Sequence, residues 1–144
     1  MVVRRNYANL LFACGLLWAA SMSVAMGQQL IAHPGVERIP EKREIVRSLF
    51  TMQLLRWPDG SPVRVFVLPD ENPTHKSFAK KWLGVFPYQL RRAWDRAVFS
   101  GTGQAPTEVA DEQEMLERVA NTPGAVGYIS HGVEDERVRF VPER

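Results

Sequence analysis

Residues 63–83 read VRVFVLPDENPTHKSFAKKWL, and this stretch decides the fold. It opens with a nearly continuous apolar run over 63–68, which is typical of a strand covered on both faces. The polar turn PDENPT follows, and we expect Asn72 to cap the next helix and Pro73 to occupy its first turn. The apolar side of that helix consists of Phe78, Ala79, Trp82 and Leu83, and Gly84 is predicted to end it. Many α/β proteins bind anions with such a strand, turn and helix, because the helix start presents unpaired backbone N–H groups.

Strand and helix patterns alternate on both sides of this stretch. We predict strands over 28–33, 63–68, 125–130 and 137–141, the last at an edge of the sheet. Further helices are predicted from about Pro40, from Pro87 and from Asp111. Residues 57–60 read as a turn, and residues 99–106 read as a glycine-rich loop. Strands separated by helices of about ten residues indicate an α/β fold, with a mostly parallel sheet and helices on both faces.

Such a sheet predicts where a ligand would bind. Ligands of parallel α/β sheets lie beyond the carboxyl ends of the strands. This rule places the loops after His33, Leu68 and Ser130 at one edge. A strand that runs antiparallel to the others would remove its loop from that set.

The chain begins with the features of a secretory signal peptide. Arg4 and Arg5 precede an apolar run over 10–20 that is too short to span a membrane, and small residues follow around 23–27. We predict a leader of residues 1–27, cleaved between Ala25 and Gly27, with cleavage after Gly27 favoured. The alternative is a lipoprotein with Cys14 as its anchor, but the bulky Phe12 precedes this cysteine and the apolar run continues past it.

Composition narrows the classes of partner and chemistry. Two of the 18 basic residues lie in the leader, so the rest of the chain is balanced against its 16 acidic residues. A balanced charge gives no support to binding of nucleic acid or of an anionic membrane. The single cysteine is Cys14, so residues 28–144 have no disulfide or thiol chemistry. These residues are enough for one compact domain and too few for two.

The order of several residues resembles phosphate-type periplasmic substrate-binding proteins. It comprises Phe50, Trp57-x-Asp59-Gly60, the strand VRVFVL, a polar turn leading to a helix with Phe78, then Trp94, a glycine-rich loop, and TPGAVGY over 122–128. More narrowly, the chain is similar to short members of this group, which have a single lobe of the periplasmic-binding-protein-like fold. The resemblance covers nearly all of residues 28–144, and TPGAVGY preceded by an acidic helix is its most specific part. It implies an exported, periplasmic protein without enzymatic activity that captures phosphate or a related oxyanion for an ABC transporter.

The chain departs from this group in two ways. Larger members carry a Gly- and Ser-rich turn that ends in threonine before the corresponding helix. Here Thr74 is retained, but Pro73 lacks an N–H, and Asp70 and Glu71 would repel a phosphate. The larger members also close two lobes on the ligand, whereas this chain has the length of one. These departures favour an alternative function, a periplasmic protein-interaction or scaffold module that keeps the fold without binding a ligand.

The candidate ligand-binding residues come from a helix start, a loop and a strand. Those at the helix start are Asn72, Thr74, His75 and Lys76. Those in the loop, where consecutive N–H groups would surround an oxyanion, are Ser100, Gly101, Thr102 and Gly103. Tyr128 would either extend its hydroxyl to the ligand edge or pack in the core. The alternatives are simple helix capping for the first set and a flexible connector for the second.

No metal, cofactor or catalytic centre is predicted. His33, His75 and His131 are widely separated and show no metal-ligand spacing, although a shared sheet edge would bring them together. Trp82 and Trp94 lie on apolar helix sides, which indicates core positions rather than an aromatic platform for a ligand. No nucleophile elbow, triad order or metal motif is present, so we predict a protein that is not an enzyme. A permease or another periplasmic protein is the expected macromolecular partner.

Overall fold

A computed structural model describes residues 27–39 and 41–141 of the chain. Nearly all of the predicted leader, over residues 1–27, lies outside the described residues, and so does the predicted helix start at Pro40. Within the described part, five strands form a single sheet in the order β3-β2-β4-β1-β5. The strands are β1 (Gln28–Ala32), β2 (Arg64–Val67), β3 (Thr107–Glu108), β4 (Ala125–Ser130) and β5 (Arg139–Val141).

The direction of one strand differs from the prediction. β2 runs parallel to both of its neighbours, β3 and β4. β1 runs antiparallel to β4 and to β5. The prediction of a mostly parallel α/β sheet is therefore confirmed for β2, β3 and β4 and wrong for β1. β1 pairs with β4 and β5 rather than with β2. The alternation of strands and helices in the sequence does not reveal which strands β1 pairs with, or in which direction it runs.

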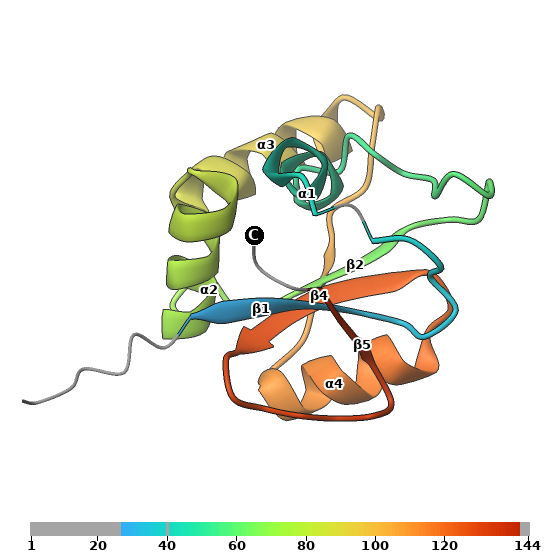
Figure 1. The fold of residues 1–144 in the computed structure, drawn as a ribbon. Helices are drawn as coiled ribbons and strands as arrows, with labels where there is room; N and C mark the ends of the chain where they lie inside the picture. The colour runs from blue at the N-terminus through green and yellow to red at the C-terminus, as the bar shows by residue number, and fades with distance from the viewer. Residues whose placement is uncertain (1–26, 40, 142–144) are drawn as a thin grey trace, which may run out of the picture.

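The helices cover both faces of the sheet, as predicted (Figure 1). In Figure 1, α1 and α3 lie above the sheet, α4 lies below it, and α2 stands beside the end toward which β4 points. The helical segments are α1 (Arg43–Phe50), α2 (Pro73–Phe78), η1 (Ala79–Leu83), α3 (Pro87–Phe99) and α4 (Glu112–Asn121). This arrangement places two helix starts, those of α2 and α4, near the ends of β2 and β4.

The segment η1 continues α2 as a turn of π-helix. It keeps Trp82 and Leu83 buried, while Lys80 and Lys81 both face solvent. Gly84 ends it with a left-handed φ of 67°, which glycine adopts without steric cost. The predicted apolar side and the glycine end of this helix are thus confirmed, whereas the wider turn was not predicted.

An aromatic cluster fills the core between the sheet and the upper helices. Phe78 of α2 stacks on Tyr128 of β4, with ring centroids 3.9 Å apart and planes within 7°. Phe50 of α1 packs edge-on against Phe78 at 4.8 Å. The indole N–H groups of Trp94 and Trp82 donate to the carbonyls of Phe50 and Gln28, respectively. Both tryptophans therefore belong to the core, as their positions on apolar helix sides predicted.

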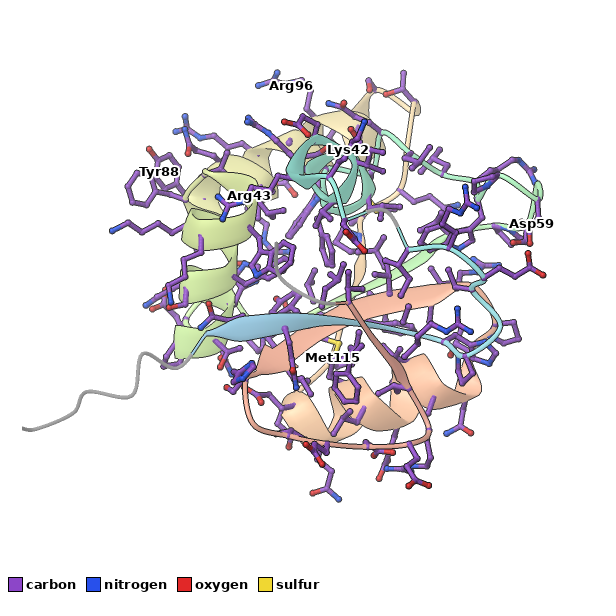
Figure 2. The ribbon with its side chains drawn as sticks, viewed as in Figure 1. Lys42, Arg43, Asp59, Tyr88, Arg96 and Met115 are labelled. Carbon is purple, nitrogen blue, oxygen red and sulfur yellow. The ribbon has the colours of Figure 1, made fainter. Side chains whose placement is uncertain are left out.

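Two glycines of the TPGAVGY stretch allow close packing. A Cβ on Gly127 would lie 2.5 Å from Met115 Sδ and 3.1 Å from Val119 Cγ2, so this glycine lets α4 approach β4. Figure 2 shows Met115 directly beneath the sheet. A Cβ on Gly124 would lie 2.3 Å from the carbonyl oxygen of Pro62. The part of the sequence with the most specific family resemblance therefore encodes packing contacts.

Candidate functional site

The strands β2, β3 and β4 end at the same side of the sheet, called here the carboxyl-end edge. The turn after Leu68, the first turn of α2 and the first turn of α4 belong to this edge. Because β1 runs the other way, Gln28 pairs with Ser130 here and the loop after His33 lies at the opposite edge. The expectation that the loop after His33 joins those after Leu68 and Ser130 is therefore wrong, because β1 is antiparallel.

A carboxylate lies among hydroxyl groups at this edge. Glu112, at the start of α4, accepts a hydrogen bond from Thr74 Oγ1 at 2.6 Å and another from Ser130 Oγ at 2.7 Å, both on its Oε1. Its Oε2 accepts from the backbone N–H of Ser130 at 3.0 Å. The two hydroxyl oxygens lie 3.1 Å apart. Thr74 is therefore at the edge, as predicted, and its hydroxyl already binds an anionic group of the chain itself.

A second group of charges lies beside the turn after β2. Arg91 of α3 donates two hydrogen bonds to Asp70, at 2.9 and 3.1 Å, and one to Glu108 at 3.1 Å. The Asp70 and Glu108 carboxylates raise the pKa of Arg91, chiefly through the hydrogen bonds to Asp70. The predicted repulsion between Asp70 and a phosphate is thus partly compensated within the chain by one guanidinium group.

His75 is buried rather than exposed at the helix start. Its side chain is 1% exposed, and its Nδ1 contacts the hydroxyl of Tyr128. That hydroxyl accepts from the backbone N–H of Leu68 at 2.9 Å. We assign its single proton to a hydrogen bond with Nδ1, because this tautomer gives the hydroxyl both an acceptor and a donor contact. The neutral ring then carries its proton on Nε2, which has no hydrogen-bond partner among the described residues and lies 3.8 Å from Asp70 Oδ1. One buried donor at this edge therefore remains unpaired.

Burial controls the ionisation of this pair. The pKa of His75 is lowered from its ordinary value, mainly by burial, although the nearby Asp70 carboxylate acts in the opposite direction. The pKa of Tyr128 is raised, again mainly by burial. Both groups are thus neutral near pH 7. Tyr128 is fully buried and lies in the core, the second of the two positions considered for it.

The two remaining candidates at the helix start have local partners. Asn72 caps α2, since its side-chain oxygen accepts from the backbone N–H of Thr74 at 2.8 Å. Lys76 is exposed and pairs with Glu71 at 2.7 Å. Among the described side chains of this edge, the carboxylates of Asp70, Glu71, Glu108 and Glu112 outnumber the cations of Lys76 and Arg91. The carboxyl-end edge therefore carries a net negative charge.

The glycine-rich loop lies elsewhere. Ser100, Gly101, Thr102 and Gly103 follow the end of α3, and in Figure 1 this end is far from α2. The backbone N–H groups of Gly101, Thr102 and Gly103 donate to carbonyls of Val98 and Ala97. The structure thus does not bring this loop together with Thr74, and these amides terminate a helix.

Sequence reasoning missed the residues that dominate the edge: Glu112, Ser130 and Arg91. Ser130 is the last residue of a correctly predicted strand, so the strand-end rule was sufficient to find it. Glu112 directly follows Asp111, which was predicted as a helix start. No local pattern indicates that Arg91 reaches Asp70, because this contact depends on the packing of α3.

Two depressions in the surface of the described residues differ in their position, and the larger one lies away from these residues. It has a volume of about 570 Å³ and is lined by residues at the opposite edge, including His33, Trp57, Asp59 and Gly124. The smaller one, about 430 Å³, adjoins the carboxyl-end edge and is lined by Asp70, Glu71, Lys76, Lys80, Phe86, Pro87 and Tyr88. Unlike the larger depression, it includes Asp70 and Glu71 of the turn after β2, which belongs to the carboxyl-end edge.

Residues 27–39 and 41–141 contain neither a metal-binding cluster nor a membrane-spanning helix. No group of three His, Cys, Asp or Glu side chains in these ranges is arranged to bind a metal ion. His33 lies at the edge opposite that of His75, so the three histidines do not converge. No helix within the same ranges combines the length and apolar character that crossing a bilayer requires.

Comparison with known proteins gives information on the fold. No family model matches the sequence. No curated protein matches it either. Among solved structures, an ABC-type phosphate transport receptor from Vibrio cholerae matches with a TM-score of 0.63 and 17% identity, over 81% of this chain and 45% of the receptor. The chain has the fold of a phosphate-receptor lobe.

Two further structures agree with this phosphate-receptor fold. A protein from Clostridium perfringens, assigned as a phosphate ABC transporter substrate-binding protein and solved with bound phosphate, has a TM-score of 0.60 at 18% identity over 78% of this chain and 43% of its own. PstS from Borrelia burgdorferi has a TM-score of 0.57 at 13% identity, over 74% and 41%. The predicted family resemblance is thus confirmed at the level of fold. This chain spans less than half the length of these receptors, which are transport proteins rather than enzymes.

Proposed function

We propose that this chain is a solute-binding lobe that captures a small oxyanion at the carboxyl-end edge, with phosphate as the first ligand to test. The observation that carries this proposal is the group of three donors, two hydroxyls and one amide, that hydrogen-bond the Glu112 carboxylate. These neutral donors are held by two elements, α2 and β4, and rigid protein sites stabilise oxyanions with neutral donors of this kind. The phosphate-receptor fold supports the same class of ligand.

The unpaired donor of His75 adds to this proposal. A neutral imidazole with its proton on Nε2 offers a hydrogen bond to an acceptor without adding charge. The four carboxylates of the carboxyl-end edge weaken the binding of any anion there. We therefore expect an affinity in the millimolar range, well below that of a site with a net positive charge.

The cellular role follows from the predicted leader and the fold. Export of residues 28–144 to the periplasm would place the lobe where solute receptors serve ABC transporters. The chain spans less than half of the length of its structural neighbours. A permease or another periplasmic protein is the proposed partner at the carboxyl-end edge. Cell fractionation with mass measurement of the mature N-terminus tests this localisation, and an uncleaved cytoplasmic product would refute it.

Calorimetric titration of purified residues 28–144 tests the ligand. Phosphate, sulfate and molybdate are titrated separately into the wild type and into Thr74→Val, which loses one donor and keeps the side-chain shape. Saturable heat for at least one oxyanion, reduced in the variant, is the expected result. Absence of binding for all three at millimolar concentration would overturn the proposal.

A second function, the protein-interaction module, has one specific observation in its favour. Phe86 and Tyr88 are 56% and 57% exposed and stack with ring centroids 6.0 Å apart. They line the depression beside Asp70 and Glu71, and Figure 2 shows Tyr88 projecting outward from the start of α3. Exposed aromatic residues are enriched in protein interfaces.

A cross-linking pull-down from periplasm distinguishes the two functions. The wild type is compared with a Phe86→Ala/Tyr88→Ala double variant. A stoichiometric partner other than a permease, captured only by the wild type, supports the interaction module. Capture of a permease alone, or of nothing, favours solute binding.

A further inference from the structure

Glu112 has no role in capping its own helix. Asp111 is the N-cap of α4, and its carboxylate accepts from the backbone N–H of Glu114 at 2.8 Å. The Glu112 carboxylate turns away from these amides and bonds Thr74 and Ser130, which lie 38 and 18 positions away in the sequence. The position of this carboxylate is thus set by its tertiary partners.

The hydrogen-bond geometry around Glu112 is that of a bound ligand. Oε1 receives both hydroxyls, at 2.6 and 2.7 Å, while Oε2 receives an amide at 3.0 Å. These are normal lengths for hydrogen bonds to an anionic oxygen. An oxyanion that used the same donors would place one oxygen where Oε1 lies and another where Oε2 lies.

We propose that Glu112 is a resident anion, a specificity-determining side chain that occupies the oxyanion position of the lobe and competes with external ligands. This inference rests on the proposed function, because it assigns the same donors to both anions. An external oxyanion gains these hydrogen bonds only when Glu112 rotates away from them. Even then, the displaced carboxylate remains nearby and repels the ligand.

The competition predicts that removal of Glu112 strengthens binding. Glu112→Ala frees the two hydroxyls and the amide of Ser130 and removes one negative charge. We expect the Kd for inorganic phosphate to fall by at least about tenfold relative to the wild type. Glu112→Gln keeps the side-chain shape and removes the charge, so we expect an intermediate gain.

Glu117→Ala is the matched control. Glu117 is an exposed residue of the same helix, and its replacement causes the same change in net charge. We expect the Kd of the Glu117→Ala variant for inorganic phosphate to equal that of the wild type. In a Glu112→Ala/Thr74→Val double variant, the gain in affinity is expected to disappear, because one of the freed donors is absent. Circular dichroism and thermal unfolding establish that each variant is folded, and Glu112→Gln replaces Glu112→Ala if the latter does not fold.

The calorimetric outcomes separate this inference from the proposed function. Phosphate binding by the wild type at millimolar concentration, with tighter binding by Glu112→Ala, supports both. Binding by Glu112→Ala alone supports the resident anion and overturns oxyanion capture by the natural chain. Equal affinities for the wild type and Glu112→Ala overturn the inference and leave the proposed function intact. No binding by any folded variant overturns both.

Discussion

Gly124 lies at a point where three segments of the chain meet. Its carbonyl accepts hydrogen bonds from the indole of Trp57 and from the backbone N–H of Arg64. Its φ of 76° is in the left-handed region, which other residues adopt only with strain. A side chain here would also collide with the carbonyl of Pro62. Gly124 therefore joins the turn before β4 to the turn before β2.

Replacement of Gly124 tests this junction. We expect Gly124→Ala to lower the free energy of unfolding by about 2–4 kcal/mol. Both the strained φ and the clash of the new Cβ with the Pro62 carbonyl contribute to this loss. Gly60→Ala is the control, since Gly60 has a φ of 86° but nothing within 4 Å of an added Cβ. Its cost is expected to be about 1–2 kcal/mol, from strain alone. Urea denaturation measures both, and equal losses would show that the clash does not exist.

His75 makes stability depend on pH. Burial lowers its pKa in the folded protein, despite the neighbouring Asp70 and Glu108, whereas in the unfolded chain it takes up a proton as the pH falls through about 6.5. The unfolded state then binds more protons, so the free energy of unfolding falls below that pH, by at most about 1.4 kcal/mol per pH unit. Denaturation at pH 7.5 and 5.5 measures this loss.

Two variants isolate the contribution of His75 to this loss. His75→Gln has no titrating ring, so we expect a smaller loss of stability between the two pH values. His131→Gln replaces an exposed histidine and is expected to behave as the wild type. Identical pH dependence in the wild type and His75→Gln would contradict the assignment.

At the scale of elements, α4 and β4 fit each other through Gly127. Gly127→Ala would place a methyl group against Met115 and Val119, which are fully buried. We expect a loss of about 1–3 kcal/mol in the free energy of unfolding from this overpacking. Met115→Ala opens space at the same contact, so the double variant should be more stable than the sum of the single losses predicts, by at least about 0.5 kcal/mol. Additive losses, measured by chemical denaturation, would mean that the two residues do not touch.

Local patterns identified most elements because their physical signals are local. The cap at Asn72, the proline at the start of α2 and the glycine at the end of η1 act within a few residues, and all three are confirmed. β3 was missed because its two residues, Thr107 and Glu108, are exposed and are ordered only by pairing with Phe66 and Val67. The direction of β1 was likewise set by its distant partner.

At the scale of the whole molecule, the buried side chains of the described residues form one cluster that includes both faces of the sheet. We therefore predict a single cooperative unfolding transition for residues 28–144, with an enthalpy of about 80 kcal/mol. Tryptophan fluorescence reports on Trp57, Trp82 and Trp94, none of which lies in α4, while far-ultraviolet circular dichroism also reports on α4. The two signals should change at the same temperature. Loss of fluorescence before loss of helix would indicate that α4 unfolds separately.

The carboxyl-end edge and Thr74 were predictable, whereas the contacts made there were not. Strand ends and a helix cap can be located from short patterns, which is why Thr74 was placed correctly. The contact of Glu112 with Thr74 spans 38 positions and depends on how α4 packs. His75 was predicted as a ligand-binding residue at the helix start, and tertiary packing buries it against Tyr128.

The π-helical turn from Ala79 to Leu83 has a consequence for comparing this chain with others. In a π-helical turn the backbone hydrogen bond joins residues five positions apart, which is one position more than in an α-helix. Residues before Ala79 and after Leu83 therefore follow different helical registers. A pairwise alignment with a receptor whose corresponding helix is purely α-helical needs a one-residue gap at Lys80 or Lys81. Without that gap, every position from Trp82 to the start of α3 would be matched to the wrong residue.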